Sequence, residues 1–109
     1  MNTTRLAELE AELREIPLPP KPTFAEMHDP LVRKLETAKH ESACLSIGML
    51  KDTVKNVVSI ADSIGVESSM AQALLRQARK YLEAARSDLG DDHQTVRITR
   101  EILRLVSQP

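Results

Sequence analysis

Apolar residues recur at helical spacing along most of the chain, beginning with residues 4–16. Leu6, Leu9, Leu13 and Ile16 follow one another at spacings of three, four and three, and glutamates occupy several of the positions between them. This pattern predicts an amphipathic helix. A helix of about 13 residues is marginal by itself, so it needs a surface on which to pack.

Prolines at positions 17, 19, 20 and 22 separate this helix from the rest of the chain. Proline lacks an amide donor and favours extended polyproline geometry, in which the seven residues of "PLPPKPT" span roughly 20 Å. We therefore expect residues 1–16 to form an arm helix that lies on another surface. Residues 17–23 form its linker, and residues 24–109 form the helical domain.

The longest helical pattern runs from Pro30 to Ile64. Asp29 followed by Pro30 is a start signal, and Gly65 stands where a left-handed C-terminal cap belongs. At 1.5 Å per residue such a helix is about 50 Å long, which is longer than a compact monomer of this size needs. Gly48 is its one interior glycine, and whether the helix bends there stays open.

Two apolar stripes, rotated by roughly 120° from one another, follow this long helix. The first stripe consists of Leu31, Leu35, Ala38, Leu45 and Met49. The second consists of Ala43, Ile47, Leu50, Val54, Val57, Ala61 and Ile64. Two apolar faces indicate two packing partners. The helix is either the buried centre of one bundle, or it uses one stripe for its own core and the other for a second chain.

Two shorter helices are expected after Gly65. Ser69 and Gln72 form a capping box for a helix from Met70 to Leu89, which Gly90 ends, and a last helix starts at Asp91 or Asp92. The apolar stripe of the former is Met70, Leu74, Ala78, Tyr81, Leu82, Ala85 and Leu89. The inward residues of the latter are Val96, Ile102, Leu103 and Val106. The predicted fold class is all-α, a small helical bundle with one long central helix that pairs in a homodimer.

The amino-acid composition of the chain also favours a helical fold. Apolar residues make up 41% of the chain but aromatic residues only 2%, so the core must be built from aliphatic side chains and Met. The single Cys44 excludes an internal disulfide and fits a reducing compartment. No apolar run has the length of a signal peptide or a membrane span, so the expected location is cytoplasmic.

No constellation of catalytic residues is visible, and we expect a protein that is not an enzyme and has no cofactor. His40 and Cys44 are four residues apart and share a helix face, which is the spacing of metal ligands. Without a third ligand they are better read as a partly covered thiol beside a surface histidine, so no metal site is predicted. Cys44 could instead link two chains.

Residues 59–80 raise the possibility of a helix-turn-helix that reads DNA. Ala61 supplies a small residue at the helix crossing and Gly65 a turn glycine. The residues that would meet DNA are Ser69, Gln72, Arg76, Arg79 and Lys80. Against this reading, Glu67 brings a negative charge to the edge of the DNA, and the net charge of -1 lacks the basic excess of phosphate-binding proteins. DNA binding is therefore kept as the alternative function.

In overall plan the chain resembles the QslA-type antiactivators of bacterial quorum sensing, which are small all-helical proteins. The resemblance rests on chain length, the leading helix "RLAELEAELREI", the strut "PLPPKP", the long helix from "DPLVRKLETAKHESACLSIGMLKD" onward, and the two shorter helices behind it. It implies a non-catalytic homodimer that binds a LuxR-type transcription regulator and blocks its dimerisation or DNA binding.

The residues alone lead to a compatible hypothesis, in which the protein is an interaction protein. The expected partner-binding residues are Leu6, Leu9, Leu13, Ile16, Leu31, Leu35, Leu45 and Met49. The expected dimer interface, or core, is Ala43, Ile47, Leu50, Val54, Val57 and Ala61. The two stripe assignments can be exchanged, because the sequence does not distinguish which face the chain itself covers.

Overall fold

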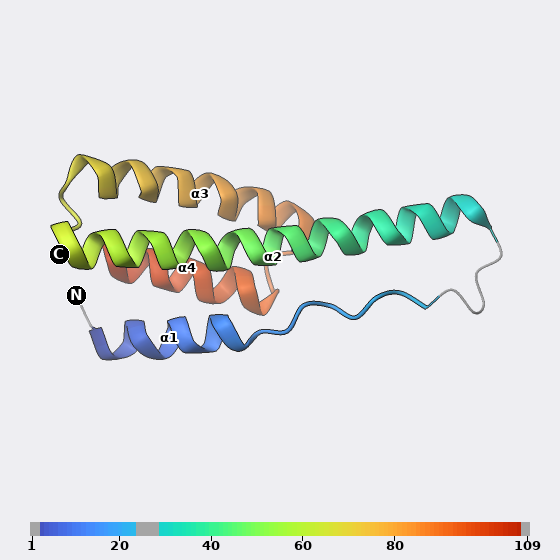
Figure 1. Cartoon of the computed structure of the whole chain (residues 1–109), viewed down its shortest axis with the longest axis horizontal. Coiled ribbons are helices and arrows are strands. Elements are labelled where there is room, and N and C mark those ends of the chain that lie inside the picture. Colours follow the sequence, from blue (N-terminus) through green and yellow to red (C-terminus); the bar gives the residue numbers. More distant parts are fainter. Residues whose placement is uncertain (1–2, 24–28, 108–109) are drawn as a thin grey trace.

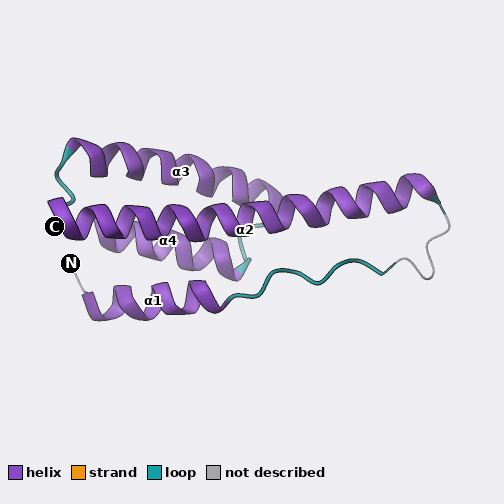
Figure 2. Cartoon of the chain, in the orientation of Figure 1, coloured by secondary structure: helices purple, strands orange, loops and turns teal. Residues whose placement is uncertain are grey.

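The computed structural model of the chain describes residues 3–23 and 29–107. Within these residues there are four helices and no strand: α1 (Thr3–Glu15), α2 (Pro30–Ile64), α3 (Ser69–Leu89) and α4 (Gln94–Ser107) (Figure 1, Figure 2). This confirms the predicted all-α class with one long helix that packs against the others.

The long helix α2 begins and ends where the sequence predicts. The Asp29 carboxylate accepts a hydrogen bond of 2.9 Å from the amide of Leu31 and so caps the helix, with Pro30 in the first turn. At the other end Gly65 has a φ of +90°, which disfavours other residues, and its amide donates to the carbonyl of Ala61. The helix continues through Gly48 without interruption.

The two shorter helices begin at slightly different residues from those predicted. The cap of α3 is Ser68 and not Ser69, because the Ser68 hydroxyl accepts from the amide of Ala71 at 3.1 Å. The α4 helix begins at Gln94 and not at Asp91 or Asp92, since the His93 ring nitrogen Nδ1 accepts from the Thr95 amide at 3.1 Å.

The second stripe of α2 forms the centre of the chain's own core. Ile47, Leu50, Val54, Val57 and Ala61 are buried within this single chain, Ala43 is half-buried, and Ile64 is exposed. The assignment of this stripe to a dimer interface is therefore wrong, and the alternative assignment to the core holds. Homodimer formation itself stays a prediction.

α3 and α4 complete that core. α3 runs antiparallel beside α2, with the most extensive packing of any helix pair, and α4 returns along both (Figure 1). All four residues predicted to point inward from α4, namely Val96, Ile102, Leu103 and Val106, are buried. In α3 the buried residues are Ala71, Leu75, Ala78, Leu82 and Ala85. The predicted start of that stripe was wrong, because Met70 is exposed and Leu74 only half-buried.

The first helix, α1, is part of the bundle. Its apolar residues Leu6, Leu9 and Leu13 are at most 3% exposed, and Ile16 just beyond it is also buried. α1 packs mainly on α4 and also on α2 (Figure 1). The prediction of an arm on another surface is therefore wrong, since the marginal helix finds its partner within the chain. These four residues offer no surface to a second protein in this structure.

The proline-rich linker is extended, as predicted, but it runs beside the N-terminal part of α2 (Figure 1). Two side chains of α2 hold it there. Lys51 donates from Nζ to the carbonyl of Ile16 at 2.5 Å, and the Nε2 of His40 donates to the carbonyl of Pro19 at 2.9 Å.

Candidate protein-docking face

The N-terminal half of α2 projects beyond the other three helices (Figure 1). We call residues 30–46 of α2 the projecting segment. None of its described side chains is fully buried, whereas the buried residues of α2 begin at Ile47. The bundle is correspondingly elongated, with extents of 54 × 24 × 20 Å. The projecting segment therefore offers helix surface that the chain itself does not cover.

The first apolar stripe lies on this uncovered surface. Leu31 is 74% exposed, Leu35 54% and Leu45 65%, while Ala38 is exposed and Met49 is half-buried where the bundle begins. We call these five residues the exposed stripe. Leu31, Leu35, Leu45 and Met49 were predicted to bind a partner, and the structure brings them onto one accessible face. Single exposed leucines are ordinary, but several along one helix face mark an interaction surface.

The linker lies away from this stripe, whereas α3 meets its face at Ser42. His40, which holds the linker, lies nine residues from both Leu31 and Met49, so at 100° per residue it is on the opposite side of the helix. Ser42 and Ser46 each donate a hydrogen bond of 2.8 Å to the same carboxylate oxygen of Asp88, near the end of α3. At 100° per residue Ser42 falls between Leu31 and Leu35 around the helix, so the end of α3 lies against the stripe at this level and fixes the orientation of the projecting segment.

Charged residues of both signs border the stripe. Lys39 forms an ion pair with Glu36 at 3.6 Å on one side, and Lys34 and Glu41 lie at helix positions on the other. An apolar strip with mixed charged borders is the usual surface of a helix that packs against a second helix. Val32 is also 41% exposed near the helix start, but it lies beyond the charged border of Lys39 and outside the stripe.

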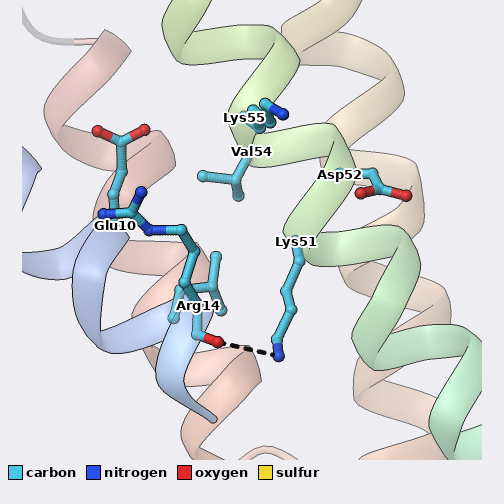
Figure 3. Close-up of a pocket in the computed structure, with 7 residues that line it drawn as sticks. Glu10, Arg14, Lys51, Asp52, Val54 and Lys55 are labelled. Atoms are coloured by element: carbon cyan, nitrogen blue, oxygen red, sulfur yellow. Dashed lines mark hydrogen bonds between the residues drawn. The ribbon is translucent and has the colours of Figure 1, made fainter.

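A second concave region lies between α1 and α2 (Figure 3). This cleft of about 370 Å³ is lined by the apolar residues Leu13 and Val54 and by the charged residues Glu10, Arg14, Lys51, Asp52 and Lys55. Figure 3 shows Lys51 reaching from α2 to the carbonyl of Arg14, at 3.4 Å. Its ammonium group satisfies carbonyls at the end of α1. The polar groups that converge here therefore join two helices.

His40 and Cys44 come together as their spacing predicts. The Cys44 sulfur lies 3.6 Å from Nε2 of His40, and the thiol is half-buried beside the linker. Among the described residues no group of three or more His, Cys, Asp or Glu side chains is placed to hold a metal ion. The pair lies at the contact between α2 and the linker, away from the exposed stripe.

The residues of the alternative DNA-binding reading lie on the surface of α3. Ser69, Gln72, Arg76, Arg79 and Lys80 are all exposed. The corner itself differs from a helix-turn-helix, because α2 and α3 run side by side and antiparallel (Figure 1), whereas that motif sets its helices at about 90–120°. Gln72 donates to the carbonyl of Val66 at 2.7 Å, and Arg79 to the hydroxyl of Ser107 at 3.0 Å.

Nearby arginines on α3 and α4 are held in ion pairs. Arg86 donates to Asp91 at 2.5 Å, and this hydrogen bond, followed by the positive charge of Arg86, lowers the pKa of Asp91. Arg100 approaches the same carboxylate oxygen at 3.5 Å. Arg104 pairs with Glu101 one turn away and lowers the pKa of that carboxyl, mainly through its hydrogen bond. Asp91 and Glu101 thus partly neutralise the positive charge of these arginines.

The fold and the face together define a small helical bundle that presents a projecting, apolar helix surface. Comparison with protein-family models, with curated proteins and with solved structures found no match for the chain. In the part of the chain that the structure describes, none of the helices has both the length and the apolarity of a membrane span.

Proposed function

We propose that the protein is a non-catalytic, protein-binding regulator that docks a helix of its partner on the exposed stripe. The observation that carries this proposal is the exposure of Leu31, Leu35 and Leu45 along one face of a helix that projects beyond its own bundle. Burying a leucine fully is worth about 1.5–3 kcal/mol, so covering these three supplies several kcal/mol toward association.

The surroundings of the stripe support a docking role. Hydrogen bonds to Asp88 and to the linker hold the projecting segment in place, so little conformational freedom is lost when a partner binds. Anchors spaced by three and four residues match the surface of a partner helix. The partner-binding role that was expected of α1 passes in this proposal to the exposed stripe alone, because the α1 leucines are buried.

The partner class in this proposal is a LuxR-type transcription regulator, in a cytoplasmic setting. The resemblance in layout to the QslA-type antiactivators suggests this class, and the long helix and the linker that carry the resemblance are present as helix and extended chain. By occupying a helix that the regulator needs for its own pairing, the protein would prevent dimerisation and release the regulator from DNA.

The experiment uses a purified LuxR-type regulator bound to its fluorescent operator DNA. Addition of this protein should release the operator and lower its anisotropy. The Leu35→Glu variant should lose this effect by at least tenfold in concentration, because a charge replaces an apolar anchor. Met70→Glu is the matched control, because Met70 is 55% exposed against 54% for Leu35 and lies at the start of α3, away from the stripe.

Two outcomes would contradict the proposal. If Leu35→Glu released the operator as well as the unchanged protein did, the exposed stripe would not be the docking face. If the protein alone shifted random duplex DNA in a salt-dependent manner, and Arg76→Ala with Arg79→Ala abolished the shift, the DNA-binding alternative would take its place.

A further inference from the structure

The proline-rich linker is confined to polyproline II geometry by its own sequence. Every residue from Ile16 to Pro22 either is a proline or immediately precedes one. Proline fixes its own φ at about −65°, and the residue before a proline is restricted to extended conformations. The structure accordingly shows this stretch as extended chain after α1 (Figure 1).

The exposure of the linker side chains follows the period of that geometry. Polyproline II has three residues per turn, so residues three apart share one edge. Ile16 is buried and both Pro19 and Pro22 are half-buried, and these three residues form one edge. The residues of the other two edges are exposed, Pro17, Pro20 and Thr23 on one and Leu18 and Lys21 on the other. We call these two the exposed edges.

Contacts to α2 use the main chain of the covered edge. The carbonyl of Ile16 accepts a hydrogen bond of 2.5 Å from Lys51, and the carbonyl of Pro19 accepts one of 2.9 Å from His40. Neither hydrogen bond involves a linker side chain. Lys21 forms no hydrogen bond or ion pair with any residue that the structure describes. The linker is therefore held in place while its exposed edges keep their side chains available.

We propose that the exposed edges bind a partner protein in a groove lined by aromatic side chains. Segments with the pattern Pro-x-x-Pro dock in such grooves because their extended shape is already formed, and Pro17 and Pro20 have this spacing. Leu18, which is 55% exposed, adds an apolar contact beside them. The ammonium group of Lys21 requires a carboxylate at the corresponding end of the groove.

The composition of the chain shows that this partner is a different protein. The chain has one Phe, one Tyr and no Trp, so a second copy cannot line a groove with several aromatic side chains. Nucleic acid is disfavoured because Lys21 is the only basic residue of the linker, whereas binding to phosphates depends on several cations.

This site goes beyond the proposed function and is separate from the exposed stripe. The linker is held by His40, which lies on the side of α2 opposite to Leu31 and Met49. Both surfaces can therefore be occupied at once, and one can fail without the other. Because the linker is stiff and already anchored, little conformational entropy is lost when a groove closes on it.

The first measurement is tryptophan fluorescence. The chain has no Trp, so any change in emission reports the groove of the added domain. A set of purified SH3 and WW domains, each with a tryptophan in its aromatic groove, is titrated with the unchanged protein. At least one domain with a carboxylate beside its groove should bind with a Kd on the order of 10–100 µM, and decaproline should compete. No change in any domain at about 500 µM protein would overturn the proposal.

The second measurement compares the edges of the linker. Pro17→Ala and Pro20→Ala should each raise the Kd for that domain at least fivefold, because each removes a ring from an exposed edge. Pro19→Ala and Pro22→Ala are the matched controls, since they remove the same ring from the covered edge and should change the Kd less than twofold. Equal losses in all four variants would refute recognition of the exposed edges.

The third measurement tests the charge and the independence of the site. Lys21→Glu should raise the Kd at least fivefold and Lys21→Arg should leave it within twofold, whereas equal binding of both variants would overturn the carboxylate contact. Leu35→Glu, which alters the exposed stripe, should bind the domain as the unchanged protein does. Circular dichroism checks that each variant keeps the helical content of the unchanged protein.

Discussion

The ammonium group of Lys51 on α2 donates a hydrogen bond of 2.5 Å to the main-chain carbonyl of Ile16, just beyond α1. It also reaches the carbonyl of Arg14 at 3.4 Å. A single cation thus satisfies carbonyl groups at the end of one helix from the side of another, and it complements the negative end of the α1 dipole. This contact joins the N-terminal segment to the long helix.

Lys51→Met should therefore loosen α1 selectively. Hydrogen bonds to charged groups contribute about 1.5–3 kcal/mol when protected from water, and partial exposure here reduces the expected loss to about 1 kcal/mol. The free energy of unfolding in urea measures the loss, and faster amide exchange in residues 3–15 than in α3 would locate it. Lys55→Met, in the same cleft, is the control, and equal effects of both would show that the contact to Ile16 is not responsible.

Leu13→Ala should destabilise the fold by about 2–5 kcal/mol, because Leu13 is only 2% exposed and its removal leaves a cavity in the core. Leu31→Ala removes the same atoms from a side chain that is 74% exposed and should change the stability of the monomer by less than about 0.5 kcal/mol. Chemical denaturation of each variant gives both values. Equal losses would contradict the position of α1 in the bundle.

Two buried threonines of α4 predict variants that are more stable than the unchanged protein. The Oγ1 atoms of Thr95 and Thr99 are buried and have no hydrogen-bond partner among the described residues. Replacing either by valine exchanges an unsatisfied hydroxyl for a methyl group of similar shape, so each variant should stabilise the fold by about 1 kcal/mol. A thermal melt of each single variant measures this gain. Thr95→Ser and Thr99→Ser, which keep the hydroxyl, should produce no gain.

The ion pair between Arg86 and Asp91 predicts a dependence of stability on pH. The hydrogen bond and charge of Arg86 hold the pKa of Asp91 below its ordinary value of 3.8. The contribution of this carboxylate is therefore fully present above that value and is lost as the pH falls through the lower pKa of the folded state. Asp91→Asn should reduce stability at pH 7 and flatten its decline in acid, measured as urea midpoints across pH 2 to 7. Asp92→Asn, the neighbouring residue, should retain the steeper decline.

Much of the helical layout could be predicted from sequence, because its signals are local. The limits of α2 depend on Asp29, Pro30 and Gly65, whose effects on the backbone do not require knowledge of the rest of the chain. Apolar periodicity likewise predicted the inward face of α4. In α3 the periodicity was ambiguous at the start, where Met70 with Leu74 and Ala71 with Leu75 give adjacent stripes, and the small Ala71 proved to be the buried residue.

The place of α1 could not be predicted from local signals. Proline content indicates that residues 17–23 are extended and roughly how long they are, but not in which direction they leave the helix. That direction is fixed by contacts distant in sequence, from His40 to Pro19 and from Lys51 to Ile16. Which of the two stripes of α2 is exposed could not be predicted either, because only the packed chain shows which face of the helix is covered.

The packing of α1 against α4 also has a consequence for the order in which the chain folds during synthesis. Of the four described helices α1 leaves the ribosome first, but its principal partner α4 leaves last. The hairpin of α2 and α3 can form while Leu6, Leu9 and Leu13 still face water, which is the state in which nascent chains associate wrongly or bind chaperones. Among these four helices, the one made first is therefore the last to be covered.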